Sequence, residues 1–386
     1  LDPRPSPLIL IAMNADYLIV GAGLYGATFA RRAAEAGRRV LVIDRRAHIG
    51  GNCYTESVEG IHVHRYGPHI FHTNNQAVWD FVSRFATFNR YRHRGCVANG
   101  DRRFSFAMNL LTLHQLWGVT TPAEARRKLD DVRLDFPRPD NLEEWILSQV
   151  GRELYDLFVR GYTTKQWGRA PSELPASIIR RIPIRLTWDD NYFDDAFQGI
   201  PVGGYTKLFE NMLDHDRIQF ETGVDYFRDR DELDQAAPNI VYSGQIDEFF
   251  DDRFGPREHR SLRFESEVVD GDHQGTSIVN YADAEVPYTR IVEHKHFEFQ
   301  TARQSVITRE YPAAYEAGRE AYYPIGDAEN QHLYEKYRAL AGREAPHVRF
   351  GGRLGSYKYY DMHQVIAQAL KAADDDLAPA RLRIAA

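Results

Sequence analysis

Three closely spaced glycines and one acidic residue near the start of the chain could bind a dinucleotide. Gly21, Gly23 and Gly26 form a G-x-G-x-x-G pattern, and Asp44 follows a second apolar run. In this pattern the first glycine allows a tight turn, the second lets a pyrophosphate approach the backbone, and the third lets a helix pack against a strand. The acidic residue would accept a hydrogen bond from a ribose hydroxyl. The spacing therefore predicts a dinucleotide site.

A second glycine pair, Gly50 and Gly51, follows Asp44 in the stretch RRAHIGGNCY. Such a pair is unusual in NAD domains and suits a longer cofactor that passes close to more of the backbone. The late stretch GGRLGSYKYYDM could contact the same cofactor from the C-terminal end. These features favour FAD, and NAD stays an alternative.

Four histidines, His62, His64, His69 and His72, follow the glycine pair. His62 and His64 would share one face of a strand, but a metal site needs three or four converging ligands. His69 and His72 stand in YGPHIFHT behind a Gly-Pro bend. We expect His69 to face the cofactor, His72 to lie in the same shell, and no metal to be bound. A plain structural role stays open for both.

The composition limits the class of protein. The chain has 386 residues, of which 43% are hydrophobic and 27% charged, and its formal net charge is -7. This is typical of a soluble protein with a large core and argues against a general nucleic-acid binder. Only Cys53 and Cys96 occur, which fits a reducing compartment. No apolar run approaches the roughly 18 residues that span a bilayer, so we expect a cytoplasmic protein without membrane insertion.

The elements that position these residues alternate along the chain. Residues 16–44 read as strand, glycine turn, helix and strand, and the helix stops at Gly37. A mostly helical region runs from about 105 to 215, with Asn141 as a helix N-cap. From about 217 to 310, alternating apolar residues predict strands of an antiparallel sheet.

The expected fold class is α/β, or α+β overall, on a Rossmann-like core. A discontinuous FAD-binding domain would comprise residues 14–104, 202–225 and 330–375. Residues 105–200 would form a helical insert with a mobile lid, and residues 226–329 an antiparallel sheet domain that contributes to the substrate site.

Several longer motifs, found between about residues 16 and 370, resemble bacterial UDP-galactopyranose mutases. They include GAGLYGA, HIGGNCY, GYTTKQWG, PYTRIVEHKHF and GGRLGSYKYYDMHQVI. The resemblance implies an isomerase that interconverts UDP-galactopyranose and UDP-galactofuranose on reduced FAD, without net redox change, for surface polysaccharide synthesis. It also implies that flavin N5 attacks the anomeric carbon, that UDP leaves, and that UDP returns to the reclosed ring.

Cleavage of the bond between sugar and UDP places negative charge on the diphosphate, which fixed cations would stabilise. The resemblance points to Arg181 and Arg290 as these catalytic cations, with His69 as a third catalytic residue. Without the resemblance, Arg181 would read as a solvated cation at a helix end and Arg290 as an ordinary strand residue.

Neutral donors would complete the phosphate and sugar contacts. The resemblance points to Tyr192, Tyr323 and Tyr359 for the phosphates and to Asn280 for a sugar hydroxyl. An arbitrary tyrosine is more often a packed ring with an exposed hydroxyl.

The uracil would need a flat apolar partner. The resemblance points to Tyr162 for stacking, with Phe158 beside it one helical turn away. Trp167 would border a mobile loop at about residues 168–180, whose closure would exclude water. The alternative for Trp167 is a plain core anchor.

The resemblance also extends the cofactor site to the C-terminal glycine stretch. Arg353 near the flavin ring, together with the N-terminus of the next helix, would favour the anionic reduced flavin. Asp361 would lie near the flavin ring, or it would serve only as the N-cap of that helix. The expected cofactor residues are Gly21, Gly23, Gly26, Asp44, Gly51, Asn52, His69, His72, Arg353, Tyr359, Asp361 and Met362.

Two other classes of protein stay open. An FAD-dependent oxidoreductase of the amine-oxidase type shares the glycine pattern but needs no pyrophosphate-binding arginines. A non-catalytic sensor would bind a UDP-sugar or dinucleotide without isomerising it. The expected partners of a mutase are the two UDP-sugars, UDP, an external flavin reductant of unknown identity and a second copy of the chain in a homo-oligomer.

Overall fold

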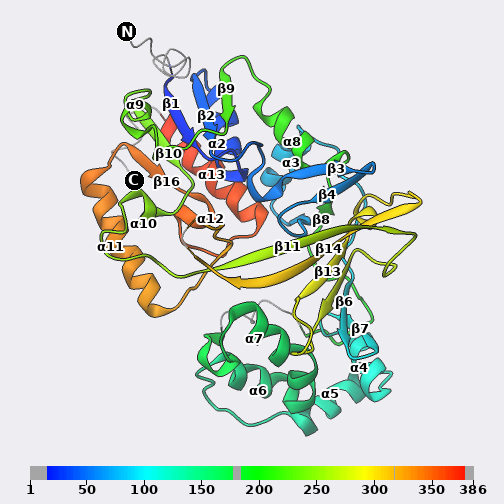
Figure 1. The fold of residues 1–386 in the computed structure, drawn as a ribbon. Helices are drawn as coiled ribbons and strands as arrows, with labels where there is room; N and C mark the ends of the chain where they lie inside the picture. Colours follow the sequence, from blue (N-terminus) through cyan, green and yellow to red (C-terminus); the bar gives the residue numbers. More distant parts are fainter. Residues whose placement is uncertain (1–14, 177–183, 317, 379–386) are drawn as a thin grey trace.

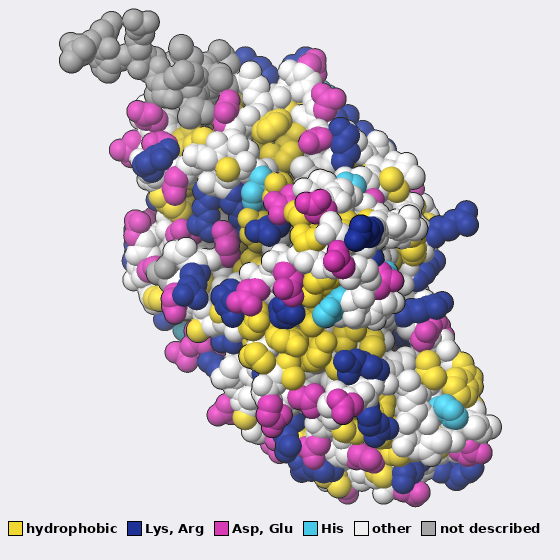
Figure 2. All heavy atoms as spheres, turned by 45° about the vertical axis from the view of Figure 1, so that its right-hand side comes forward, with side chains coloured by type: hydrophobic (Ala, Val, Ile, Leu, Met, Phe, Trp, Pro, Cys, Tyr) yellow, Lys and Arg dark blue, Asp and Glu magenta, His cyan; other side chains and the backbone are white. Residues whose placement is uncertain are grey.

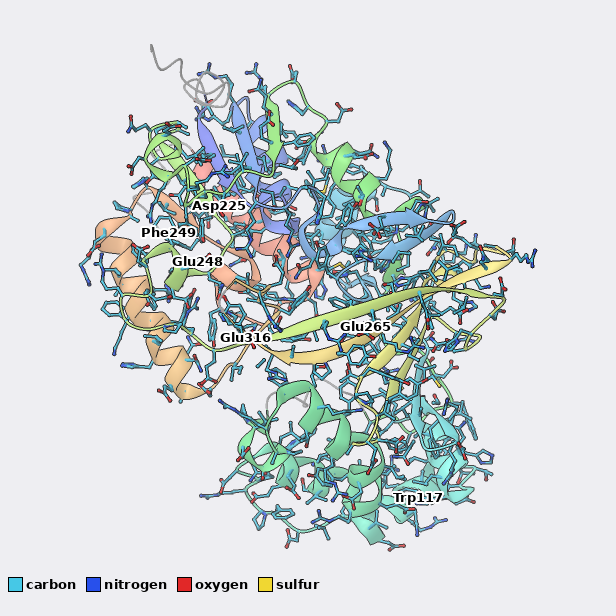
Figure 3. The ribbon with its side chains drawn as sticks, viewed as in Figure 1. Trp117, Asp225, Glu248, Phe249, Glu265 and Glu316 are labelled. Carbon is cyan, nitrogen blue, oxygen red and sulfur yellow. The ribbon has the colours of Figure 1, made fainter. Side chains whose placement is uncertain are left out.

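The computed structural model describes residues 15–176, 184–316 and 318–378. Figure 1 shows three parts: a layered α/β part, a long twisted sheet beside it, and a group of helices at the opposite end. Asp225 and Glu248 belong to the α/β part and Trp117 to the helical part, with Glu265 of the long sheet between them (Figure 3). The chain passes between these parts several times, so none of them is one continuous segment.

A five-stranded parallel sheet forms the core of the α/β part. The three central strands, Asn239–Tyr242, Tyr17–Val20 and Val40–Asp44, are almost wholly buried, as expected for a parallel sheet with helices on both faces, whereas the edge strand Ile218–Thr222 is largely exposed. Helices α2 and α13 pack together on one face, and α11 covers the other. In sheet order the strands are β16 (Val348–Phe350), β10 (Asn239–Tyr242), β1 (Tyr17–Val20), β2 (Val40–Asp44) and β9 (Ile218–Thr222); the helices are α2 (Leu24–Glu35), α11 (Ala328–Glu344) and α13 (Met362–Leu377).

A seven-stranded sheet links the α/β part to the helices. All its neighbours pair antiparallel except β12 and β6, which pair in parallel. The order is β15 (Tyr323–Pro324), β11 (His259–Asp270), β14 (Gln304–Ala314), β13 (Arg290–Glu293), β12 (Ile278–Tyr281), β6 (Gly95–Asn99) and β7 (Arg102–Phe106).

The pairing corrects part of the expected sheet. Strands β9 and β10 were expected in the antiparallel sheet, but they pair in parallel with β2 and β1. Strand β10 also lies outside the residues predicted for the FAD-binding domain. Short apolar runs such as NIVY fit either kind of sheet, because periodicity alone does not identify their neighbours. Strands β6 and β7 join the seven-stranded sheet, which is therefore mixed.

The longest helix of the helical part begins at the predicted N-cap residue, Asn141. The Asn141 Oδ1 atom accepts a hydrogen bond from the Glu144 backbone N–H at 3.0 Å. The helix is not continuous, because Gly151 adopts φ 76°. A Cβ at Gly151 would lie 2.2 Å from the Val132 carbonyl oxygen, so the close approach of two helices excludes any side chain. The elements are α4 (Leu110–Trp117), α5 (Pro122–Val132), α6 (Leu142–Leu154), the π-helix η2 (Tyr155–Arg160), α7 (Gly161–Trp167) and η3 (Pro171–Glu173).

Smaller elements connect the three parts. Strand β3 pairs with β4, and β5 with β8, as two-stranded antiparallel sheets. In the described part of the chain, no helix combines the length and apolar character that crossing a bilayer requires. These elements are β3 (Thr55–Val58), β4 (Ile61–His64), β5 (Phe71–Thr73), β8 (Phe197–Gly199), η1 (Gly51–Cys53), α3 (Gln76–Ser83), α8 (Gly204–Leu213), α9 (Arg230–Leu233), α10 (Ile246–Phe249), η5 (His294–Phe297) and α12 (Gly352–Gly355).

Candidate functional site

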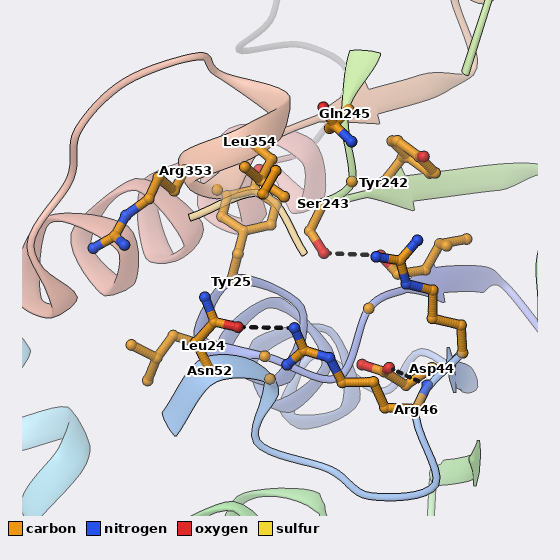
Figure 4. A pocket seen from close by; sticks show the side chains of 18 of the residues that line it. Leu24, Tyr25, Asp44, Arg46, Asn52, Tyr242, Ser243, Gln245, Arg353 and Leu354 are labelled. Carbon is orange, nitrogen blue, oxygen red and sulfur yellow. Dashed lines mark hydrogen bonds between the residues drawn. The ribbon is translucent and has the colours of Figure 1, made fainter. Parts of the chain in front are cut away.

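A cavity of about 240 Å³ lies at the carboxyl ends of β1, β2 and β10 (Figure 4). Ligands of open α/β sheets bind at this edge, where loops leave the strands. Its wall brings together residues that are far apart in the sequence. Eight expected cofactor residues line it: Gly21, Gly23, Asp44, Gly51, Asn52, His69, Arg353 and Met362.

The glycines keep the backbone of this cavity open to a ligand. Gly21 has φ +108°, and a Cβ there would lie 2.1 Å from Ser243 Oγ. Gly51 has φ +54°, and its Cβ would lie 2.9 Å from Gly23 Cα. Gly26 does not line the cavity; its Cβ would lie 1.9 Å from the Gly21 carbonyl oxygen, which fits the packing role of the third glycine.

Asp44 and Arg46 are two of the charged residues that line this cavity. The Asp44 carboxylate accepts hydrogen bonds from the backbone N–H groups of Ala22 at 2.8 Å and Arg46 at 2.9 Å. The Arg46 guanidinium pairs with the Glu320 carboxylate, at 2.5 Å from Nη2, and its Nη2 atom also donates to Asn52 Oδ1 at 2.8 Å, whereas its Nη1 atom is buried without a partner in the protein. A guanidinium with a free donor beside a glycine-lined cavity fits the diphosphate of a dinucleotide. Sequence reasoning missed Arg46, although its place just after the acidic strand end was a usable signal.

The histidines do not form a metal centre. The His69 backbone N–H donates to His64 Nδ1 at 3.1 Å, and the His64 backbone N–H donates to His294 Nδ1 at 3.2 Å. Because Nδ1 of His294 accepts, its Nε2 carries the proton and donates to Thr308 Oγ1 at 2.8 Å. His64 is thus a buried core residue that fixes the loop of His69.

His69 itself faces the cavity. Its Nδ1 atom donates to the Gly67 carbonyl at 2.8 Å, which leaves Nε2 as an acceptor. Burial lowers the pKa of His69 to about 4, so the ring is neutral at physiological pH. The loop therefore presents an uncharged imidazole to the cavity.

His62 and His72 lie away from the cavity wall. The His62 Nδ1 atom pairs with Glu298 Oε1 at 2.7 Å, and the His72 Nδ1 atom pairs with Asp195 Oδ2 at 2.6 Å. The His72 ring also stacks on Phe193, with centroids 3.7 Å apart. Within the described residues, the one group of side chains close enough to hold a metal ion contains none of the four expected histidines; it comprises Asp272, Glu293 and His296.

Another set of expected residues lies in one row across the seven-stranded sheet. Asn280 pairs with Arg290, and Arg290 pairs with Glu310, in antiparallel register. Residues directly opposite each other project from the same face of a sheet, so these side chains share one face. Phe264 extends the row beyond Glu310. The register therefore brings together residues from four separate strands.

Arg290 is held between a carboxylate and a hydroxyl. Its Nε atom lies 3.3 Å from Glu310 Oε1, and its Nη2 atom donates to the Tyr162 hydroxyl at 2.6 Å. The Glu310 side chain is 1% exposed, whereas that of Arg290 is 21% exposed. Burial opposes the charge of Arg290, but the Glu310 carboxylate outweighs it and raises the pKa of the guanidinium well above its ordinary value. The result is a permanent cation with a buried counter-ion and an accessible side.

Glu310 was not predicted from the sequence. Burial raises the pKa of its carboxyl group, and the Arg290 charge opposes that shift. At a separation of 3.3 Å from a guanidinium, the carboxylate form is the one that completes the pair. The only sequence signal was an acidic residue at an inward position of a strand.

Two expected tyrosines lie between Arg290 and the cavity. Tyr323 and Tyr359 stack with centroids 5.2 Å apart and an angle of 16° between their planes. The guanidinium of Arg353, which lines the cavity, lies 5.8 Å and 5.3 Å from the two ring centroids. Both tyrosines are near enough to act on the pKa of Arg290. Arg353 therefore connects the cavity with the Arg290 cluster, although Tyr359 does not line the cavity.

Phe158 and Trp167 pack into the helical part. Phe158 is 3% exposed and contacts the Phe104 ring edge-on, with centroids 5.1 Å apart. Trp167 packs partly buried against the same hydrophobic core, as the plain anchor alternative expects. After Trp167, Leu174 is buried and its carbonyl accepts a hydrogen bond from the Leu142 N–H at 2.8 Å. Movement of the expected lid stays a prediction.

Of the remaining expected residues, Tyr192 lies beside the Arg290 cluster, near enough to Tyr162 to act on its pKa, whereas Asp361 lies off the cavity wall and Arg181 cannot be placed. The Tyr192 backbone N–H donates to the His93 carbonyl at 2.7 Å, and its ring packs against Phe193. Asp361 is the N-cap residue of α13, as its capping alternative expects, and it is not on the cavity wall. Arg181 lies outside the described residues.

The fold and the cavity define a Rossmann-type dinucleotide-binding protein. A family described as NAD(P)-binding Rossmann-like domain matches residues 19–85, and a family described as UDP-galactopyranose mutase matches residues 157–359. The chain belongs to the UDP-galactopyranose mutase family.

Individual relatives cover nearly the whole chain. A protein named probable UDP-galactopyranose mutase from Klebsiella pneumoniae is 42% identical over 94% of this chain and 95% of its own length. A dTDP-fucopyranose mutase from Escherichia coli is also 42% identical, over 92% of this chain and 97% of its own. The crystal structure of a reduced UDP-galactopyranose mutase has the same fold, with a TM-score of 0.74 and 14% identity over 94% of each chain.

Proposed function

We propose that this chain is a UDP-galactopyranose mutase, an isomerase that interconverts the pyranose and furanose forms of UDP-galactose without net redox change. One observation carries the proposal: Arg290 has a buried counter-ion on one side, the Tyr162 hydroxyl on another, and an accessible surface. A fixed cation of this kind suits a diphosphate that gains charge as its bond to the sugar breaks. Membership of the family supports the same activity.

The cavity is proposed to hold FAD, which must be reduced for activity. The glycine cradle, the Asp44 carboxylate and the unpartnered Nη1 atom of Arg46 fit an adenine dinucleotide. When bound, reduced flavin supplies the nucleophilic nitrogen that takes the sugar from UDP. His69 would present a neutral acceptor to the ring system, and Arg353 a cation.

The chain's own residues would bind and orient the substrate. Arg290 would stabilise the departing UDP, with Arg181 as a second cation. Tyr323 and Tyr359 would donate hydroxyls to the phosphates without adding charge. The Tyr162 ring would lie against the uracil.

A second substrate is a specific alternative. The relative named dTDP-fucopyranose mutase is as similar to this chain as the relative named UDP-galactopyranose mutase. Both substrates carry a diphosphate and a sugar that changes ring size, so the Arg290 cluster suits either.

The test uses the protein with bound FAD, reduced with dithionite. UDP-galactofuranose is incubated in one reaction and dTDP-fucopyranose in another, and the ring isomers are separated by chromatography. We expect UDP-galactopyranose from the first reaction, only after reduction, and without consumption of reductant. Conversion of the dTDP-sugar alone would mean that the substrate is dTDP-fucopyranose and not a UDP-sugar. If neither sugar is converted, the mutase activity is refuted. Oxygen consumption matched to substrate loss would favour an oxidase.

Location, reductant and oligomeric state complete the proposal. We propose a cytoplasmic location, an external flavin reductant and a homo-oligomeric state. A purified sample analysed by light scattering at several concentrations would test the last of these.

A further inference from the structure

The ammonium group of Lys165 is surrounded by backbone carbonyls rather than by carboxylates. Its Nζ atom donates to the carbonyl oxygens of Tyr281 at 2.9 Å, Asp283 at 2.7 Å, Val286 at 2.9 Å and Tyr288 at 3.0 Å. Lys165 lies on α7, and all four carbonyls belong to the end of β12 and the turn that leads to β13. The Lys165 side chain thus binds backbone carbonyls along the whole β12–β13 turn.

This turn connects the two strands that carry Asn280 and Arg290. Helix α7 carries Tyr162, whose hydroxyl accepts the hydrogen bond from Arg290. The same helix and the same hairpin therefore meet twice, once through Lys165 and once through Tyr162 and Arg290. Any shift of the turn relative to α7 would change the geometry at Arg290.

Two further contacts show how closely α7 is held. A Cβ at Gly161 would lie 2.1 Å from the Ala282 carbonyl oxygen, so the start of α7 touches the turn directly. At the other end, Arg260 Nε of β11 donates to the Gln166 carbonyl at 3.0 Å. Lys165 lies between these two contacts and carries the charge that the converging carbonyls need.

We propose that Lys165 is a positioning residue of the substrate site: its ammonium group closes the β12–β13 turn and so holds Arg290 and Asn280 in place relative to Tyr162. Four inward-pointing carbonyl dipoles repel one another without a cation between them. An ammonium group has three donors and no acceptor, so it satisfies such a cage where a neutral side chain cannot. This inference rests on the proposed function, because it concerns binding of the UDP group.

Lys295 offers a matched control within the same sheet domain. It is buried, and its Nζ atom also donates to backbone carbonyls, those of Gly271 at 3.0 Å and Ala302 at 3.4 Å, although, unlike Lys165, it also pairs with a carboxylate, Asp272 Oδ1, at 2.5 Å. These carbonyls belong to other loops, away from α7 and the β12–β13 turn. Lys295→Met therefore removes a buried, carbonyl-bound lysine without touching the hairpin turn.

The experiment measures UDP affinity of the oxidised protein by calorimetry and kcat/KM of the reduced protein. For Lys165→Met we expect about tenfold weaker UDP binding and a larger fall, of about 30-fold, in kcat/KM. Lys165→Arg keeps a cation and should recover part of both losses, whereas Lys295→Met should stay within about threefold of the original protein. If Lys165→Met does not fold, Lys165→Gln takes its place, with melting temperature as the check.

A double-mutant cycle separates positioning from a general loss of stability. If Lys165 acts through Arg290, then Lys165→Met in an Arg290→Ala background should lower UDP affinity by less than about twofold. Equal losses in both backgrounds, or unchanged UDP binding in the single Lys165 variants, would overturn the inference. If the unmodified protein itself neither binds UDP nor isomerises the sugar, the proposed function fails, and this inference fails with it.

Discussion

The cavity at the parallel sheet and the Arg290 cluster on the mixed sheet are built by different means. The cavity is shaped mainly by the backbone. Glycines with positive φ leave space for a ligand, and the Asp44 carboxylate accepts hydrogen bonds from two backbone N–H groups. At the Arg290 cluster, polar and charged side chains of three strands meet in one row. The first site depends on local chain geometry and the second on the register of distant strands.

This difference predicts how each site fails. A change at the cavity should remove the cofactor while leaving the sheet row intact. A change in the row should leave the cofactor bound but impair handling of the diphosphate. The substitutions below, ordered by expected effect, test that separation.

The largest effect is expected for Arg290→Ala. Loss of the cation should lower kcat/KM by about 10²-fold or more while FAD content stays unchanged. Absorbance of the bound flavin and steady-state kinetics measure the two quantities.

The neighbouring Arg309 provides the control for that substitution. It directly precedes Glu310 on β14, so its side chain projects from the opposite face, and it pairs with Glu267 at 2.7 Å. Arg309→Ala should stay within about twofold, because exposed ion pairs contribute little. A near-normal rate for Arg290→Ala would remove this residue from its proposed role.

Gly21→Ala should act at the other site. A Cβ at φ +108° would lie 2.1 Å from Ser243 Oγ, so we expect the purified protein to retain about tenfold less FAD. Gly37→Ala is the matched control, since Gly37 also has positive φ but nothing within 4 Å of its Cβ. Equal FAD contents in the two variants would contradict a cofactor site in this cavity.

Glu310→Gln should have a smaller effect than loss of Arg290. The amide keeps the shape of the carboxylate but removes the counter-charge, so we expect kcat/KM to fall by about tenfold. Glu267→Gln, on the exposed side of the neighbouring strand, should change little. If Glu310→Gln has no effect, the counter-ion does not orient Arg290.

The smallest effect concerns the acid stability of the buried histidines His64 and His294 behind the His69 loop. Burial lowers the pKa of His294 to about 3, below the value of about 6.5 for an unfolded chain. The unfolded state therefore binds the proton first, and stability should be lost as pH falls from about 6.5 toward about 3. Urea unfolding should show a fall of about 2 kcal/mol between pH 7 and pH 5 from this group alone, with the slope approaching about 1.4 kcal/mol per pH unit only below pH 6.

His294→Asn tests the origin of that pH dependence. The amide can accept the hydrogen bond of the His64 N–H, but it does not titrate in this range. The slope of stability against pH should become shallower. An unchanged slope would assign the acid sensitivity to other groups.

The sequence was informative where a site depends on local backbone geometry. The glycine pattern, Asp44, and the cap at Asn141 were all predicted and lie where expected. Each is defined by spacing within a few residues or within one strand–helix–strand unit.

Long-range partners were not predictable in the same way. Glu310 pairs with Arg290 on the neighbouring strand, and Lys165 binds a turn more than a hundred residues away; nothing local marks the register that joins them. The same reason explains why β10 was assigned to the wrong sheet, since a short apolar strand does not encode its neighbour.

The order of strands in the parallel sheet has a consequence for how the protein is made. The central strand β1 pairs with β10, and β10 pairs with β16 near the C-terminus. A growing chain must therefore emerge from the ribosome past residue 350 before this sheet can close. Apolar strands exposed during that wait favour aggregation, so we expect synthesis to depend on chaperones that shield the early half.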